Sequence, residues 1–147
     1  MSVLKLSSSP KMANQLMDQN RFSASMLWPG SQVHYNNQTI RYLQEFDEKN
    51  PNPDWNKRID KIIEWMSDNP EEANCVFAYF DEPDFQAHKF GPFSHQVLAE
   101  VKRADNIIGY LLDKLRQKKL LERTNLIILS DHGMSEIRLT LRFMINV

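Results

Sequence analysis

Two short apolar runs limit the folds open to this chain. Residues 76–80 (VFAYF) and 126–129 (LIIL) contain no alternating polar positions. A short run of this kind is typical of a strand that is buried on both faces, as in a parallel sheet. Between the two runs, Pro92 precedes a long stretch of helical periodicity. Strand, helix and strand in this order predict a βαβ unit with a right-handed crossover, and therefore an α/β fold with a partial parallel sheet flanked by helices.

Two amphipathic helices are predicted to cover this sheet. The long helix carries one apolar stripe, with charged residues elsewhere around its axis. The stripe consists of Val97, Leu98, Val101, Ala104, Ile108, Leu111, Leu112 and Leu115. The other helix is predicted over residues 55–67, with Asp54 as its N-cap. Its apolar positions recur at helical spacing at Trp55, Ile59, Ile62, Ile63 and Met66.

The remaining segments are expected to be less regular. Residues 22–28 are predicted to form a short strand, and residues 29–53 to be mostly loop. Residues 1–20 are polar and poorly patterned, so we expect an irregular arm there, and residues 138–147 are expected to be a divergent tail. The whole chain of 147 residues is interpreted as a single, partial domain.

Composition excludes some functions and leaves others open. The net charge of -1 gives no basic patch for nucleic acid. Cys75 is the only cysteine, so an internal disulfide is impossible. The cysteine count therefore does not indicate whether the protein works in an oxidising or a reducing compartment. The pattern indicates neither a signal peptide nor a transmembrane segment. The triplet Asn37-Gln38-Thr39 would accept a glycan if the chain were secreted.

Two polar clusters follow the two apolar runs. Asp84 and His88 come after the first run, and Asp131 and His132 come after the second. Because ligands bind beyond the carboxyl ends of parallel strands, we expect these side chains to lie close together. A carboxylate with an imidazole is a ligand set that zinc favours. Gly133 would permit a sharp turn that aims adjacent side chains at one ion.

Each cluster also has a plain structural interpretation. Asp131 and His132 would then form a surface turn, and Asp84 with His88 would be a helix-start carboxylate with an incidental histidine. The other histidines, His34 and His95, are expected to be solvated. The spacing by itself leaves both interpretations of the clusters open.

The motifs together are more specific than either cluster. They resemble the ectonucleotide pyrophosphatase/phosphodiesterase family of the alkaline phosphatase superfamily over residues 11–137. The segments that carry the resemblance are Trp28-Pro29-Gly30-Ser31, Glu82-Pro83-Asp84-x-x-Ala87-His88-x-x-Gly91-Pro92, Ala104-Asp105-Asn106-Ile107-Ile108-Gly109 and Ser130-Asp131-His132-Gly133-Met134. The resemblance implies a fragment of an alkaline-phosphatase-like three-layer domain that hydrolyses phosphodiester or pyrophosphate bonds with two zinc ions. It implies small substrates of the nucleotide or phospholipid type, and a location outside the cell or at its surface.

The resemblance also implies roles for individual residues. Asp84 and His88 match the ligands of one zinc ion, and Asp131 and His132 match ligands of the second. Trp28 matches an aromatic residue at the substrate pocket. Either of two further aromatic residues falls near a tyrosine that stacks on the nucleobase in nucleotide-cleaving members, namely Tyr42 and Phe46.

The chain departs from the family pattern in several places. Ala87 stands where glycine is usual, and Gln32 stands where nucleotide-cleaving members often have aspartate, which puts nucleobase preference in doubt. An upstream aspartate, the upstream threonine nucleophile and a downstream histidine are not found in the matching segments. The family mechanism uses a phosphoryl-threonine intermediate, so this chain is expected to be an internal fragment that is inactive by itself.

Two functions other than a phosphodiesterase are also compatible with the sequence. The chain could be a non-catalytic remnant or binding module of the same fold, because it supplies only two ligands for each zinc ion. A phosphomonoesterase of the same superfamily is a further alternative. The segments Glu82-Pro83-Asp84 and Trp28-Pro29-Gly30-Ser31 argue against it.

Overall fold

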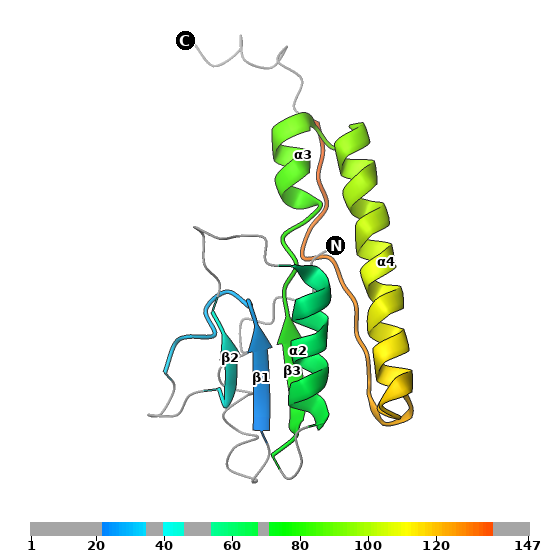
Figure 1. The fold of residues 1–147 in the computed structure, drawn as a ribbon. Helices are drawn as coiled ribbons and strands as arrows, with labels where there is room; N and C mark the ends of the chain where they lie inside the picture. The colour runs from blue at the N-terminus through cyan, green and yellow to red at the C-terminus, as the bar shows by residue number, and fades with distance from the viewer. Residues whose placement is uncertain (1–21, 35–39, 46–53, 68–70, 137–147) are drawn as a thin grey trace.

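In the part of the chain that the structure describes, a small parallel sheet is combined with three α-helices (Figure 1). The computed structural model describes residues 22–34, 40–45, 54–67 and 71–136. Its elements in chain order are β1 (Phe22–Met26), β2 (Tyr42–Gln44), α2 (Trp55–Ser67), β3 (Ala73–Ala78), α3 (Asp84–Phe90), α4 (His95–Gln117) and a 3-10 helix (Leu121–Arg123). The three strands are parallel in the order β2-β1-β3. The predicted α/β class, with a partial parallel sheet flanked by helices, is therefore confirmed.

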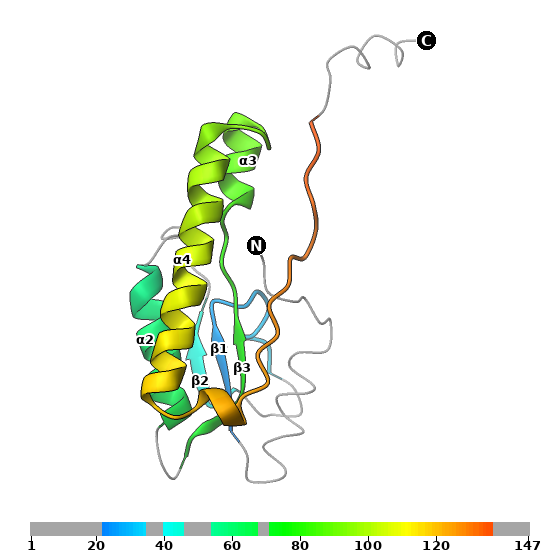
Figure 2. The same ribbon diagram turned by 90° about the vertical axis from the view of Figure 1, so that its right-hand side faces the viewer.

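Helix α2 forms where its periodicity predicted it. The backbone amide of Asn56 donates to the Asp54 carboxylate at 2.9 Å, so Asp54 caps the helix as expected. The apolar face of α2 packs against β1 and β3. Helices α2 and α4 both lie on the same face of the sheet (Figure 2). The core that they enclose with the sheet includes Ala24, Met26, Trp55, Ile59, Ile62, Ile63, Ala104, Ile107 and Leu115.

Polar contacts tie α2 to α4 beside this core. The carboxylate of Asp60 accepts a hydrogen bond from the Tyr110 hydroxyl at 2.9 Å and pairs with the Lys114 ammonium at 2.7 Å. The guanidinium of Arg103 lies 4.1 Å from the centre of the Trp55 ring, a cation–π geometry. The two helices are thus held in register by side chains as well as by apolar packing.

Helix α4 begins later than predicted and buries less of its stripe. It starts at His95 rather than at Pro92, because the Ser94 hydroxyl accepts a hydrogen bond from the Val97 amide and caps it. Leu98 and Val101 are 61% and 49% exposed. This half of the helix extends beyond the sheet and lies beside α3 instead (Figure 1). Among the described residues, no helix has the length and apolar character needed to cross a membrane.

The short strands differ from the sequence prediction at their ends. Strand β1 stops at Met26 rather than Trp28, because Leu27 has a φ of 57° and leaves the extended conformation. The segment predicted as loop contains β2, which has three residues. The arm at 1–20, the tail at 138–147 and the glycosylation triplet at Asn37 lie outside the described residues.

The predicted strand at 126–129 is wrong for this structure. Residues 124–130 are extended but pair with no strand among the described residues. Leu126 and Ile127 are 39% and 64% exposed, so the run is not buried either. A cavity of about 620 Å³ is lined by β3, α2, α4 and residues 124–128. An apolar run becomes a strand only where its backbone reaches a partner, and here the cavity lies between this run and the edge of β3.

Strand β3 also differs from expectation. It covers Ala73–Ala78 instead of residues 76–80, because its register is set by pairing with β1. Only Ala73 and Phe77 in β3 are buried, although burial on both faces was predicted. The reason is that β3 is the edge of the sheet in the described part of the chain, with β1 on one side only.

Candidate functional site

Asp84 and His88 are brought together by helix α3. They stand one turn apart on this helix, and Asp84 Oδ2 lies 3.5 Å from His88 Nε2. The helix follows β3 along the chain, so both side chains lie beyond the carboxyl end of a parallel strand. Ala87 is buried in α3, where a helical backbone accommodates its methyl group.

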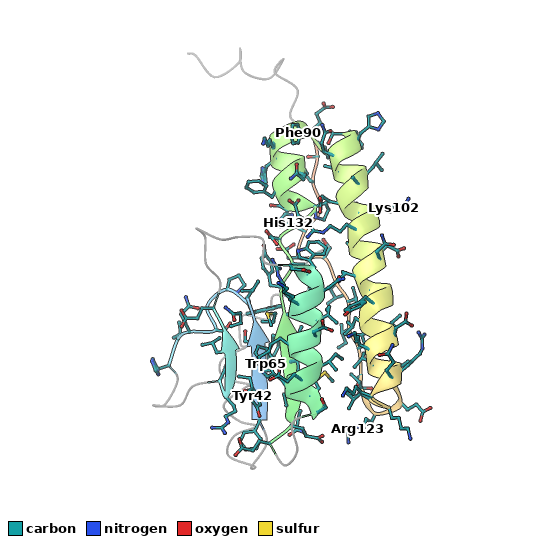
Figure 3. The ribbon with its side chains drawn as sticks, viewed as in Figure 1. Tyr42, Trp65, Phe90, Lys102, Arg123 and His132 are labelled. Atoms are coloured by element: carbon teal, nitrogen blue, oxygen red, sulfur yellow. The ribbon has the colours of Figure 1, made fainter. Side chains whose placement is uncertain are left out.

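The second cluster reaches the same place from the far end of the chain. After the 3-10 helix, the extended segment reverses the direction of α4. It runs beside β3 in the direction of that strand and passes α3 (Figures 1 and 2). His132 Nε2 then lies 3.8 Å from Asp84 Oδ1 and 3.8 Å from Asp131 Oδ2. Figure 3 shows His132 at the base of α3, above the end of the sheet. The structure therefore brings all four side chains together, although the second pair does not follow a strand.

His132 is held in a defined orientation by its own backbone. Its Nδ1 lies 2.9 Å from the Gly133 carbonyl oxygen, which can only accept, so Nδ1 carries the proton of this bond. In the neutral imidazole, Nε2 is then the nitrogen without a proton, and it faces Asp84 and Asp131. The Gly133 carbonyl and, after it, the Asp131 and Asp84 carboxylates raise the pKa of the His132 imidazole above its usual value. Gly133 has no positive φ, so the left-handed conformation open to glycine is not used at this position.

Asp84 has one carboxylate oxygen that receives no hydrogen bond within the described part of the chain. Its Oδ1 is buried and accepts no hydrogen bond from any described residue. Such a group is costly unless something compensates it. Two ligands of a tetrahedral zinc ion, each bonded at about 2.1 Å, stand roughly 3.4 Å apart. The Asp84 Oδ2 to His88 Nε2 distance of 3.5 Å is close to this separation. The donor types and this spacing therefore fit a zinc ion.

The number of ligands falls short of a complete zinc site. Within the described ranges, no group of three or more His, Cys, Asp or Glu side chains could hold a metal ion as it stands. Catalytic zinc usually takes three protein ligands. The described residues therefore form a cluster of candidate ligands that is smaller than a complete zinc site.

Two residues near the cluster were not identified from the sequence. Burial, and then the Asp131, Asp81 and Asp84 carboxylates, raise the pKa of the Tyr79 phenol, so it stays protonated at neutral pH. Burial raises the pKa of the Glu82 carboxyl, while hydrogen bonds from Gln86 oppose that rise. Both residues looked like parts of a strand and a turn. Tyr79 lies within the apolar run, and Glu82 lies in a segment that carries the family resemblance, which assigned it no role.

The predicted substrate residues have different positions. Trp28 lies two residues beyond the carboxyl end of β1, and the centroid of its ring lies 5.5 Å from that of Phe77. Tyr42 begins β2, so it lies toward the amino end of a strand. Its ring stacks on Trp65 at 5.8 Å, well away from His132 (Figure 3), and it is not brought to the metal-ligand cluster. Phe46 lies outside the described residues. His34 and His95 are exposed, as expected.

Comparison with known families decides the relationship. Residues 5–146 match the model of the type I phosphodiesterase / nucleotide pyrophosphatase family. The chain belongs to this family. One similar protein is bis(5'-adenosyl)-triphosphatase ENPP4 of Pongo abelii, which is 35% identical over 124 residues. Another is the venom phosphodiesterase CdcPDE of Crotalus durissus collilineatus, at 34% identity over 117 residues.

Solved structures of the family share this fold. Murine ENPP5, in an inactive form in complex with AMP, aligns with a TM-score of 0.66 and 28% identity over 74% of this chain. Human ENPP5 aligns with a TM-score of 0.63. The chain spans only part of these relatives. Its matches cover 84% of the chain but 26% of the ENPP4 sequence, 78% of the chain but 14% of the venom enzyme, and 28% of murine ENPP5.

Proposed function

We propose that this chain forms part of the catalytic domain of a zinc-dependent phosphodiesterase or nucleotide pyrophosphatase. The observation that carries the proposal is the position of Asp84, whose two carboxylate oxygens face His88 at 3.5 Å and His132 at 3.8 Å. Membership of the type I phosphodiesterase / nucleotide pyrophosphatase family supports the class of reaction. The reaction is hydrolysis of a phosphodiester or pyrophosphate bond.

The four side chains are assigned to two ions. Asp84 and His88 would hold one zinc ion, and Asp131 and His132 would hold the other. Bound zinc would neutralise charge on the phosphoryl group and help to activate a nucleophile. The hydrogen bond from His132 to the Gly133 carbonyl supports this assignment, because it places the proton of the neutral imidazole on Nδ1 and leaves Nε2, which faces the carboxylates, able to bind a metal ion.

The proposed substrate is a small phosphodiester, with nucleotides favoured over phospholipid-type molecules. ENPP4 is named as a bis(5'-adenosyl)-triphosphatase, and the murine ENPP5 structure contains AMP. Of the predicted aromatic contacts, we favour Trp28. It lies two residues beyond the carboxyl end of β1, at the end of the sheet where β3 leads to α3, whereas Tyr42 stands at the amino end of β2. The venom relative supports a location outside the cell.

The chain by itself is expected not to turn over substrate. Two protein ligands for each ion give weak binding, and no threonine in the matching family segment provides a nucleophile. The experiment is an assay with a nitrophenyl nucleotide ester in excess zinc, with metal content measured on the same sample. The 147-residue chain should show no activity above background. The same residues joined to the missing aspartate, threonine and histidine segments of a relative should hydrolyse the ester.

Substitutions separate the outcomes of this assay. In the completed domain, Asp131→Ala or His132→Ala should abolish hydrolysis. Zinc-dependent turnover by the chain alone, lost in Asp84→Ala, would contradict the partial site. A completed domain that binds zinc but never hydrolyses the ester would favour the alternative function, a non-catalytic binding module of the same fold.

A further inference from the structure

Glu82 is a buried carboxylate that no part of the proposed metal site uses. It lies in the short connection between β3 and α3 and is 3% exposed. Its Oε2 accepts a hydrogen bond from the Gln86 backbone amide at 3.1 Å, and its Oε1 accepts one from the Gln86 side-chain amide at 3.2 Å. Both carboxylate oxygens are therefore directed at one residue of α3. Buried acidic side chains are rare without such partners.

The first turn of α3 depends on this carboxylate. Pro83 precedes the helix and provides no side-chain hydrogen bond to cap it. The amides of Phe85 and Ala87 donate to the carbonyl oxygens of Asp81 and Pro83, whereas the Gln86 amide donates to the Glu82 side chain. The Glu82 carboxylate thus satisfies an amide that a helix start otherwise leaves without a partner. Because α3 has only seven residues, it has little stability without such contacts.

The same helix sets the separation of two proposed ligands. Gln86 stands midway between Asp84 and His88, whose side chains are 3.5 Å apart. A change in the first turn of α3 would move Asp84, its first residue, relative to His88, which is in the second turn. Metal affinity depends on such separations, because ligands that must be rearranged bind more weakly.

We propose that Glu82 is a positioning residue, which holds the first turn of α3 through Gln86 and so sets the geometry of Asp84 and His88 toward a divalent metal ion. The inference rests on the proposed function, because it assumes that Asp84 and His88 bind metal. Glu82 itself touches neither metal nor substrate in this account. Its effect is transmitted by the backbone of α3.

The test is a titration of the full chain with Co²⁺ alone, followed by visible absorption, which reports both affinity and ligand geometry. Glu82→Ala should weaken Co²⁺ binding by roughly 10- to 100-fold and alter the absorption spectrum, as for other partners that orient metal ligands. Glu82→Gln keeps an oxygen that can accept from the Gln86 amide, so it should restore most of the affinity and the parent spectrum. Glu72→Ala is the matched control, because Glu72 is ion-paired with Arg123 at the other end of β3.

The possible outcomes are distinct. Co²⁺ binding by Glu82→Ala with the parent affinity and spectrum would overturn the inference, and so would an equal loss in Glu72→Ala. If far-ultraviolet circular dichroism shows that Glu82→Ala is unfolded, Glu82→Asp decides. Its shorter side chain should fail to reach Gln86 and weaken binding, and unchanged binding would overturn the inference.

Asp84→Ala distinguishes failure of the inference from failure of the proposed function. If Asp84→Ala abolishes Co²⁺ binding while the Glu82 variants bind normally, only the positioning role is wrong. If the parent chain binds no Co²⁺, or if Asp84→Ala binds as well as the parent, the proposed metal site is wrong and the role of Glu82 fails with it.

Discussion

Asp84 Oδ1 lies 3.8 Å from His132 Nε2, although the whole of α4 separates the two residues along the chain. The contact joins the helix that follows β3 to the extended segment that follows the 3-10 helix. Asp84 Oδ1 accepts no hydrogen bond from the described residues, so the contact with His132 is between two groups that both suit a metal ion. Four consequences of the structure can be measured.

The ion pair between Arg58 and Asp81 should be important for stability. The Arg58 side chain is 2% exposed, and its Nη1 lies 3.5 Å from Asp81 Oδ1. Burial lowers the pKa of Arg58, and Asp81 opposes that change. Asp81→Ala should therefore leave the buried Arg58 charge without this carboxylate partner and lower the free energy of unfolding by about 3–5 kcal/mol in urea denaturation. Arg58→Met combined with Asp81→Ala should recover most of this loss, whereas a double variant as unstable as Asp81→Ala would contradict the account.

The link between α2 and α4 should make stability depend on pH. The hydrogen bonds from Lys114 and then Tyr110 lower the pKa of Asp60 below its usual value. A carboxyl with a lowered folded-state pKa stabilises the protein above its unfolded-state pKa, and that contribution disappears as the pH falls through the folded-state value. Asp60→Asn should therefore lower the thermal midpoint more at pH 7 than at pH 3, because the stabilisation declines below the unfolded-state pKa. An equal effect of Asp60→Asn at both pH values would contradict the role of this carboxylate.

Truncation to alanine should cost much more stability in the core than in the apolar run at residues 126–129. Leu115 is 1% exposed, so Leu115→Ala should lower the free energy of unfolding by about 2–5 kcal/mol. Ile127 is 64% exposed, and Ile127→Ala should change it by about 0.5 kcal/mol or less. Chemical denaturation of both variants tests the difference. A large loss in Ile127→Ala would mean that residues 126–129 are buried after all, as a strand would be.

Features encoded by local sequence were predictable. The period of apolar residues and the Asp54 cap gave α2 its correct ends, because both act within one or two turns. The spacing of Asp84 and His88 placed them on one face of a helix for the same reason. The expectation that Asp131 and His132 lie near them is also met, although not through the strand that was predicted.

Features that depend on distant partners were not predictable from local pattern. The run at 126–129 has the composition of a strand, but strand formation requires a backbone partner that sequence alone does not supply. The three residues of β2 are too few to show a period. The Arg58–Asp81 pair and the contact of Glu82 with Gln86 depend on packing and on the path of the connection after β3.

Zinc binding by the chain tests the central claim most directly. Calorimetric titration of Zn²⁺ into the parent chain, Asp84→Ala and His95→Ala compares a proposed ligand with an exposed histidine on α4. The account predicts weak but measurable zinc binding by the parent and by His95→Ala. The zinc affinity of Asp84→Ala should be lower by at least about 10-fold, because even the loss of a residue that only orients a ligand costs that much. Equal zinc affinity in the parent and Asp84→Ala would show that Asp84 is not a ligand and would contradict the account.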